Sequence, residues 1–102
     1  MSDRLAQLLK LHEADPADPF LTYGVAMEHV KAESFDDAVA WLEKMLERDA
    51  GYCYAYFQKA KALSALGRED DAREAVAAGI KAAKAAGDEK AFGELEELRE
   101  VL

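Results

Sequence analysis

Two stretches of the chain repeat one pattern. They are Phe35–Leu46, which reads FDDAVAWLEKML, and Glu69–Ile80, which reads EDDAREAVAAGI. Each contains Asp-Asp-Ala followed by apolar residues at helical spacing, and the two alanines, Ala38 and Ala72, lie 34 residues apart. Acidic residues are favoured in the first turn of a helix. The repetition predicts that the chain uses one helical unit twice.

The composition is that of one folded domain. The chain has 102 residues, of which 51% are hydrophobic and 33% are charged. No apolar stretch approaches the roughly 20 residues of a membrane span, and the N-terminal residues MSDRLAQLLKLHEAD lack the long apolar run of a signal peptide. The single cysteine, Cys53, cannot form an internal disulfide. We expect one cytoplasmic domain over residues 1–102.

The charge of the chain restricts its partners. The formal net charge is -8 at pH 7. A field of this sign opposes phosphate backbones and anionic membranes, so we expect neither nucleic acid nor a membrane as partner. The expected partner is another protein or peptide, neutral or basic, with apolar anchors.

Helical periodicity dominates the whole chain, and no stretch shows the alternation of a strand. The sequence therefore predicts an all-α protein of about six helices, joined by short connections that force antiparallel neighbours. The end signals place these helices over residues 2–14, 19–32, 34–49, 53–66, 69–86 and 88–102.

Individual residues mark the helix ends. The expected N-cap residues are Ser2, Asp18 and Asp88. Ser34 followed by Asp37 approximates a capping box, in which each side chain accepts a hydrogen bond from the other residue's backbone N–H. Gly67 and Gly87 are expected to end their helices, because glycine readily adopts the left-handed conformation.

Shifting the sequence on itself by 34 residues aligns the second helix with the fourth and the third with the fifth. Aromatic, small and aliphatic positions coincide in the pairs Phe20 and Tyr54, Tyr23 and Phe57, Ala26 and Ala60, Ala38 and Ala72, Leu42 and Val76, and Leu46 and Ile80. In this register the first helix corresponds to the third, with Leu8 under Leu42 and Leu11 under Met45.

A helix pair repeated at this period resembles the tetratricopeptide repeat family, whose pattern is W-x2-L-G-x2-Y, then A-x3-F, then P. The first copy reads this pattern as Thr22, Val25, Ala26, His29, Ala38, Leu42 and Ala50. The second copy reads it as Tyr56, Lys59, Ala60, Leu63, Ala72, Val76 and Lys84. Thr22 replaces an aromatic residue, Lys59 replaces an apolar one, and both final prolines are absent.

The resemblance is to a small stand-alone bacterial-type protein of this family. It implies an antiparallel helix-hairpin solenoid with two full repeats and a capping helix at each end. The expected parts are an N-terminal half-repeat helix over 1–15, repeat 1 over 19–52, repeat 2 over 53–86 and a C-terminal capping helix over 88–102. Pro16 falls where the half-repeat should carry the family's proline.

The resemblance also implies a protein-binding module or adaptor that holds a peptide or partner helix on a concave surface lined by the first helix of each repeat. The six side chains expected there, which we call the aromatic groove, are Phe20, Tyr23, Met27, Tyr54, Phe57 and Lys61. Two alternatives stay open. The aromatic rings simply fill the space between the second, fourth and sixth helices, or the same apolar patch pairs two copies as a homodimer.

Candidates for catalysis or metal binding are scattered. His12 and His29 lie on different predicted helices, without the i, i+4 spacing that brings two ligands to one metal. Cys53 begins a helix and has no obvious base partner, and Trp41 is expected to be half-buried packing. We therefore expect no enzymatic activity, no catalytic residue, no metal and no cofactor.

Two glycines interrupt predicted helices at a cost of about 1 kcal/mol each relative to alanine. For Gly79, whose mate in the other repeat is Met45, we expect close approach of a neighbouring helix. Gly24 lies beside the aromatic groove, where it either admits a ligand backbone or is simply tolerated.

Overall fold

The computed structural model describes residues 2–102, which form six α-helices and no strand. The helices are α1 (Asp3–Ala14), α2 (Pro19–Lys31), α3 (Phe35–Arg48), α4 (Cys53–Ala65), α5 (Glu69–Ala86) and α6 (Glu89–Val101). The all-α prediction is confirmed, and every helix lies where the sequence placed it, to within one or two residues at its ends.

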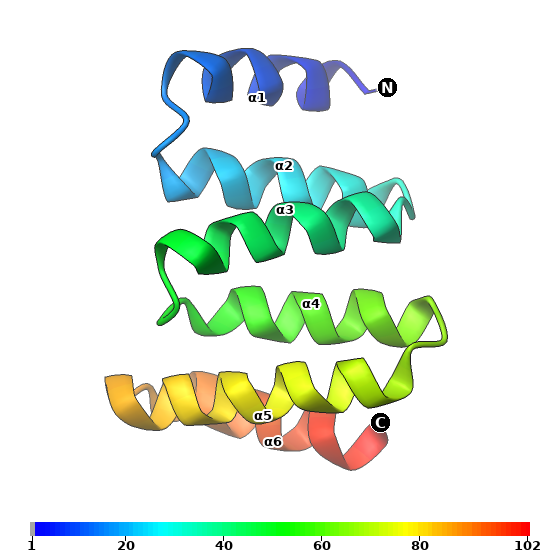
Figure 1. Cartoon of the computed structure of the whole chain (residues 1–102), viewed down its shortest axis with the longest axis vertical. Helices are drawn as coiled ribbons and strands as arrows, with labels where there is room; N and C mark the ends of the chain where they lie inside the picture. Colours follow the sequence, from blue (N-terminus) through cyan, green and yellow to red (C-terminus); the bar gives the residue numbers. More distant parts are fainter. Residues whose placement is uncertain (1) are drawn as a thin grey trace.

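The helices form an open stack rather than a closed bundle. Successive helices run antiparallel, α1 and the α5–α6 pair lie at opposite ends of the stack, and α6 lies behind α5 (Figure 1). The principal extents are 36 × 29 × 19 Å. Each helix packs chiefly against its neighbours in the chain, and α6 also contacts α4. This is the helical repeat fold that the 34-residue register predicts.

Three helices begin with the expected side-chain caps. The side chains of Ser2 and Asp88 each accept a hydrogen bond from the backbone N–H three residues further on, at 3.0 Å. Asp18 accepts one from the N–H of Phe20 at 2.9 Å, and Pro19 occupies the first turn. These caps satisfy N–H groups that have no partner inside the helix.

The predicted capping box at the start of α3 is wrong. The side chain of Ser34 makes no capping hydrogen bond. Its backbone N–H already donates to the carbonyl of His29 at 2.9 Å, closing the end of α2, so Asp37 has no free N–H to accept there. The residue that makes this closure is Glu33, whose φ of 60° is left-handed. In α4 and α5 the same conformation falls on Gly67 and Gly87, as predicted.

Small residues let the paired helices approach closely. The four repeat alanines, which the alignment pairs, are fully buried: Ala26, Ala38, Ala60 and Ala72. Larger side chains fill the space around them, with Leu42 and Met45 in one cluster and Leu63, Val76 and Leu95 in another. The core therefore consists of clusters that follow one another between neighbouring helices, as expected for stacked repeats.

The two helical glycines have different surroundings. A Cβ atom on Gly79 would lie 2.8 Å from the Cβ of Tyr56 in α4 and 3.0 Å from the side chain of Leu95 in α6. This agrees with the expected close approach of neighbouring helices. A Cβ atom on Gly24 would meet the side chain of Leu8 in α1 at 3.4 Å, so Gly24 faces α1 rather than a ligand.

Candidate partner-binding surface

The first half of the aromatic groove lies on α2. Phe20, Tyr23 and Met27 follow one another at i, i+3 and i+7, so they share one face of the helix. The opposite face packs into the core through Thr22, Val25 and Ala26, as the family pattern predicted. Phe20 is 73% exposed, whereas Tyr23 and Met27 are half-buried. An aromatic ring this exposed in the first turn of a capped helix is available for contact with another molecule.

Tyr23 joins α2 to α4. Its ring centroid lies 5.4 Å from that of Tyr52, just before α4, and its side chain packs on the cluster that contains Ala26 and Leu42. Burial, and secondarily the nearby Tyr52 hydroxyl, raise the pKa of Tyr23, while the side chain of Gln58 acts in the opposite direction. Tyr23 therefore packs between α2 and the start of α4 and is also partly exposed at the surface.

The second half of the aromatic groove lies on α4. The rings of Tyr54 and Phe57 meet edge to face with centroids 6.4 Å apart, and the exposed Lys61 places its Nζ 5.6 Å from the Phe57 ring centroid. Both rings are half-buried against the cluster that contains Leu95 of α6. Desolvation, followed by the carboxylate of Glu94 in α6, raises the pKa of Tyr54. The C-terminal helix thus partly covers this half.

Some of the six residues fit the interpretation of an exposed groove, and others fit the interpretation that the rings fill space between helices. Tyr54 and Phe57 partly fill the space beside α6, as the core interpretation holds, but Phe20 does not. Tyr54 and Lys61 each contact the Phe57 ring, whereas the ring contact of Tyr23 is with a residue that the sequence did not single out. Tyr52 precedes its helix and aligns with Asp18, so neither the periodicity nor the register marked it.

The aromatic groove lies apart from five hollows of about 200 to 560 Å³. None of these five hollows is lined by a residue of the aromatic groove. A surface with one exposed ring beside half-buried ones suits a macromolecular partner better than a small ligand, which normally binds in a concave pocket.

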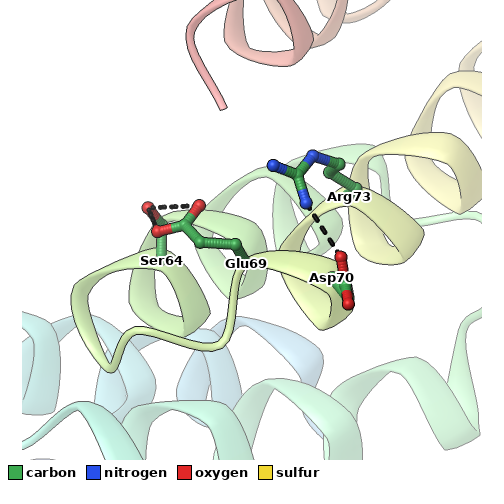
Figure 2. Close-up of polar contacts among 4 residues, drawn as sticks. All are labelled: Ser64, Glu69, Asp70 and Arg73. Carbon is green, nitrogen blue, oxygen red and sulfur yellow. Dashed lines mark hydrogen bonds and ion pairs between the residues drawn. The ribbon is translucent and has the colours of Figure 1, made fainter.

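The groove face of α4 ends in a polar clasp at the turn into α5. The Ser64 hydroxyl donates to the Glu69 carboxylate at 3.1 Å, and beside it Arg73 pairs with Asp70 at 2.9 Å on the surface of α5 (Figure 2). The first contact joins two helices, whereas the second lies within one. The clasp therefore helps to fix α4 relative to α5.

The titratable groups considered for catalysis do not converge. His12 stacks edge to face on Trp41 at 4.9 Å, and His29 Nδ1 lies 3.9 Å from an Asp37 oxygen in another part of the molecule. Burial raises the pKa of the Cys53 thiol, which favours the unreactive protonated form. Among the described residues no three His, Cys, Asp or Glu side chains are grouped to hold a metal ion. No helix within residues 2–102 has the length and apolar character to cross a membrane.

Solved structures with the same fold identify the family. The chain is 36% identical to a tetratricopeptide repeat domain protein from Salinibacter ruber known from a solution structure, which covers 83% of this chain and 86% of that one with a TM-score of 0.77. A crystal structure of a tetratricopeptide repeat domain protein from the same organism is 35% identical to the chain. It covers 80% of this chain and 91% of that one, with a TM-score of 0.75. The solution structure of a Bordetella parapertussis protein is 25% identical to the chain. It covers 98% of this chain and 87% of that one, with a TM-score of 0.86.

No protein-family model and no curated protein sequence matches the chain. The structural matches nevertheless define its class, a helical repeat protein. The identity and coverage shared with the Salinibacter ruber protein show that the chain belongs to the tetratricopeptide repeat family. Members of this fold are in general protein-interaction modules and typically not catalysts, so the partners expected for this chain are proteins.

Proposed function

We propose that the chain is a non-catalytic adaptor that binds an apolar segment of another protein, a peptide or a helix, in the aromatic groove. The observation that carries this proposal is Phe20, which is 73% exposed although its aligned residue, Tyr54, is half-buried. Exposed aromatic side chains are common carriers of interface energy, because a rigid ring buries a large apolar area at a small entropic cost.

The charge of the protein favours a neutral or basic partner. With a net charge of -8, the protein repels acidic segments at long range and attracts basic ones, which raises the association rate more than the affinity. Lys61, which lies against Phe57, is the positive side chain of the groove and would pair with a single carboxylate or carbonyl of the bound segment. The apolar anchors would then contact Phe20, Tyr23 and Met27.

The repeat boundaries belong to the same proposal: a half-repeat over 1–15, repeats over 19–52 and 53–86, and a cap over 88–102. Two closures 34 residues apart support them. The N–H of Ser34 donates to the carbonyl of His29, and the N–H of Arg68 donates to that of Leu63, both at 2.9 Å. Each repeat thus turns between its two helices in the same way.

The test uses a displayed library of short peptides selected on the immobilised full chain, followed by affinity measurement for the enriched sequences. We expect enriched peptides with aromatic or aliphatic anchors and basic flanks, and Phe20→Ala should weaken their binding by roughly tenfold or more. Phe20 is exposed, so its truncation leaves the core intact, unlike truncation of the half-buried Tyr23 or Phe57. Val101→Ala is the matched control, because Val101 is an exposed apolar residue outside the groove.

Enrichment of acidic peptides, or equal affinity for the wild type and Phe20→Ala, would overturn the proposal. Self-association through the same patch is the alternative, and it predicts a different result. Sedimentation at several concentrations would then show a dimer that Phe20→Ala dissociates. Large exposed apolar side chains in residues 2–102 are confined to Leu11, Phe20 and Val101, which is little area for a stable dimer interface of about 1,200 Å² or more.

A further inference from the structure

A second candidate site lies at the opposite end of α2 from Phe20. There the start of α1, the last turns of α2 and the turn into α3 enclose a hollow of about 500 Å³. Its wall includes the carboxylate of Glu28, whose side chain is only 11% exposed. Burying a charged carboxylate is costly unless a cation and hydrogen bonds compensate it.

The compensation that Glu28 receives inside the chain is loose. The Nε of Arg4 lies 3.6 Å from one carboxylate oxygen, and the hydroxyl of Ser2 donates to the other at 3.4 Å. Charge-assisted hydrogen bonds normally measure about 2.7 to 2.9 Å. Arg4 is itself 64% exposed, so it contacts the carboxylate from the solvent side. Glu28 therefore retains acceptor capacity that a closer cation would use.

The second repeat packs at the corresponding position without a carboxylate. The residue aligned with Glu28 in the second repeat is Ala62, which is 1% exposed and lies in the core. Glu28 is thus a largely buried charge at a position that holds an alanine in the other copy.

We propose that this hollow binds the guanidinium group of an arginine side chain from a partner protein. Arg4 already shows that a guanidinium can approach the Glu28 carboxylate, and a planar guanidinium can pair with both oxygens of a carboxylate. Ser34 also lines the hollow, and its hydroxyl, which makes no capping bond, is a further candidate acceptor. The hollow lies at the C-terminal end of α2, where the helix dipole favours a cation.

The other charged groups at the hollow act in opposite directions. Lys31 is exposed and lines the rim, where it opposes an incoming cation. His29 also lines the hollow and faces Asp37 of α3, whose carboxylate adds negative charge nearby. The site lies outside the aromatic groove, so this inference does not depend on the proposed groove function.

The test is a titration of the full chain with N-acetyl-arginine amide, followed by amide shifts in a ¹⁵N–¹H spectrum. N-acetyl-citrulline amide is the control probe, because it has nearly the same shape and no charge. We expect saturable shifts confined to residues 2–5 and 28–34 with the arginine probe and none with the citrulline probe. Equal shifts with both probes, or shifts spread over the surface, would show non-specific contact and overturn the proposal.

Three variants separate a binding role from a structural one. Glu28→Gln keeps the shape and should weaken the arginine probe by tenfold or more. Glu28→Ala introduces the residue of the second repeat and should abolish binding while the denaturation midpoint stays at or above that of the wild type. Lys31→Ala should tighten binding. Unchanged affinity in Glu28→Gln would contradict the site, and a strongly destabilised Glu28→Ala together with weak binding to the wild type would assign Glu28 a structural role instead.

Discussion

The two hairpins, α2–α3 and α4–α5, follow one plan with different side chains. Both make the same hydrogen bond between the end of one helix and the start of the next, at 2.9 Å. In the second hairpin the left-handed residue is Gly67, and in the first it is Glu33. The two hairpins thus share one backbone conformation at this turn. Only the second has glycine there, the residue that adopts this conformation at the lowest cost.

The two hairpins also differ in the roles of their unusual residues. The second hairpin lies between the first hairpin and α6, and its Gly79 allows three helices to meet closely. The first hairpin carries the exposed Phe20, the buried charge of Glu28 and the strained Glu33. This difference supports the proposal that the first hairpin presents more of the surface for other molecules, whereas the second hairpin contributes more to holding the stack together.

The largest expected effect is at Gly79. Gly79→Ala should destabilise the protein by about 2 kcal/mol, because the new methyl group would overlap the Cβ of Tyr56 and press on Leu95. Gly93→Ala is the matched control in α6, where a Cβ atom meets nothing within 4 Å, and it should stabilise by up to about 1 kcal/mol through helix propensity. Urea denaturation of both variants checks this. Similar gains from both would mean that the helices do not need the glycine.

Exchanging the turn residues tests the hairpin comparison directly. Glu33→Gly should stabilise the protein by about 1 kcal/mol, because a left-handed conformation costs a residue with a side chain about that much. Gly67→Glu should destabilise it by a similar amount, for the same reason. The denaturation midpoints of the two variants should therefore move in opposite directions. Movement in the same direction would show that the two turns are not equivalent.

The polar clasp in Figure 2 should contribute less. Ser64→Ala removes a half-buried hydrogen bond between α4 and α5 and should cost about 0.5 to 1 kcal/mol. Arg73→Ala removes a surface ion pair with the fully exposed Asp70 and should change the midpoint very little, at low or high salt. If Arg73→Ala destabilised the protein more than Ser64→Ala, the hydrogen bond between Ser64 and Glu69 would not be what fixes α4 relative to α5.

The smallest effect concerns alkaline pH and Tyr23. Burial raises the pKa of Tyr23 in the folded protein, so the unfolded chain releases this proton at lower pH, near the ordinary value of 10.0. The resulting stability is fully present below that pH and is lost as the pH rises through the folded pKa. Cys53 and Tyr54 shift in the same direction.

Tyr23→Phe, which introduces the aligned residue Phe57, should therefore reduce the loss of stability at high pH without removing it. Denaturation midpoints measured at neutral pH and above pH 10 provide the comparison. An unchanged pH dependence would mean that Tyr23 ionises as freely in the folded chain as in the unfolded one.

The sequence predicted the helices well because their signals are local. Ser2, Asp18 and Asp88 cap their helices through contacts within three residues, and Gly67 and Gly87 close helices by their own conformation. The capping box failed because its donor, the Ser34 N–H, was taken by the preceding helix, a competition that the short motif does not show. Only alignment with Gly67 could have marked Glu33.

The candidate surfaces were less predictable because they depend on how helices cover one another. The periodicity placed six side chains on corresponding faces of two helices, but it could not show that α6 partly covers Tyr54 while Phe20 stays exposed. The hollow beside Glu28 could not be predicted from the sequence, because its wall comes from three separate segments. Comparison of Glu28 with Ala62 in the register was the signal that could have found it.

Photocrosslinking of a library-selected peptide tests most directly whether the first hairpin carries the partner surface. The photoreactive residue benzoylphenylalanine replaces Phe20 in one sample and Val101 in the other, and mass spectrometry locates the adducts. We expect an efficient adduct from position 20 and none from position 101. An adduct at position 101 alone, or equal adducts at both, would contradict it.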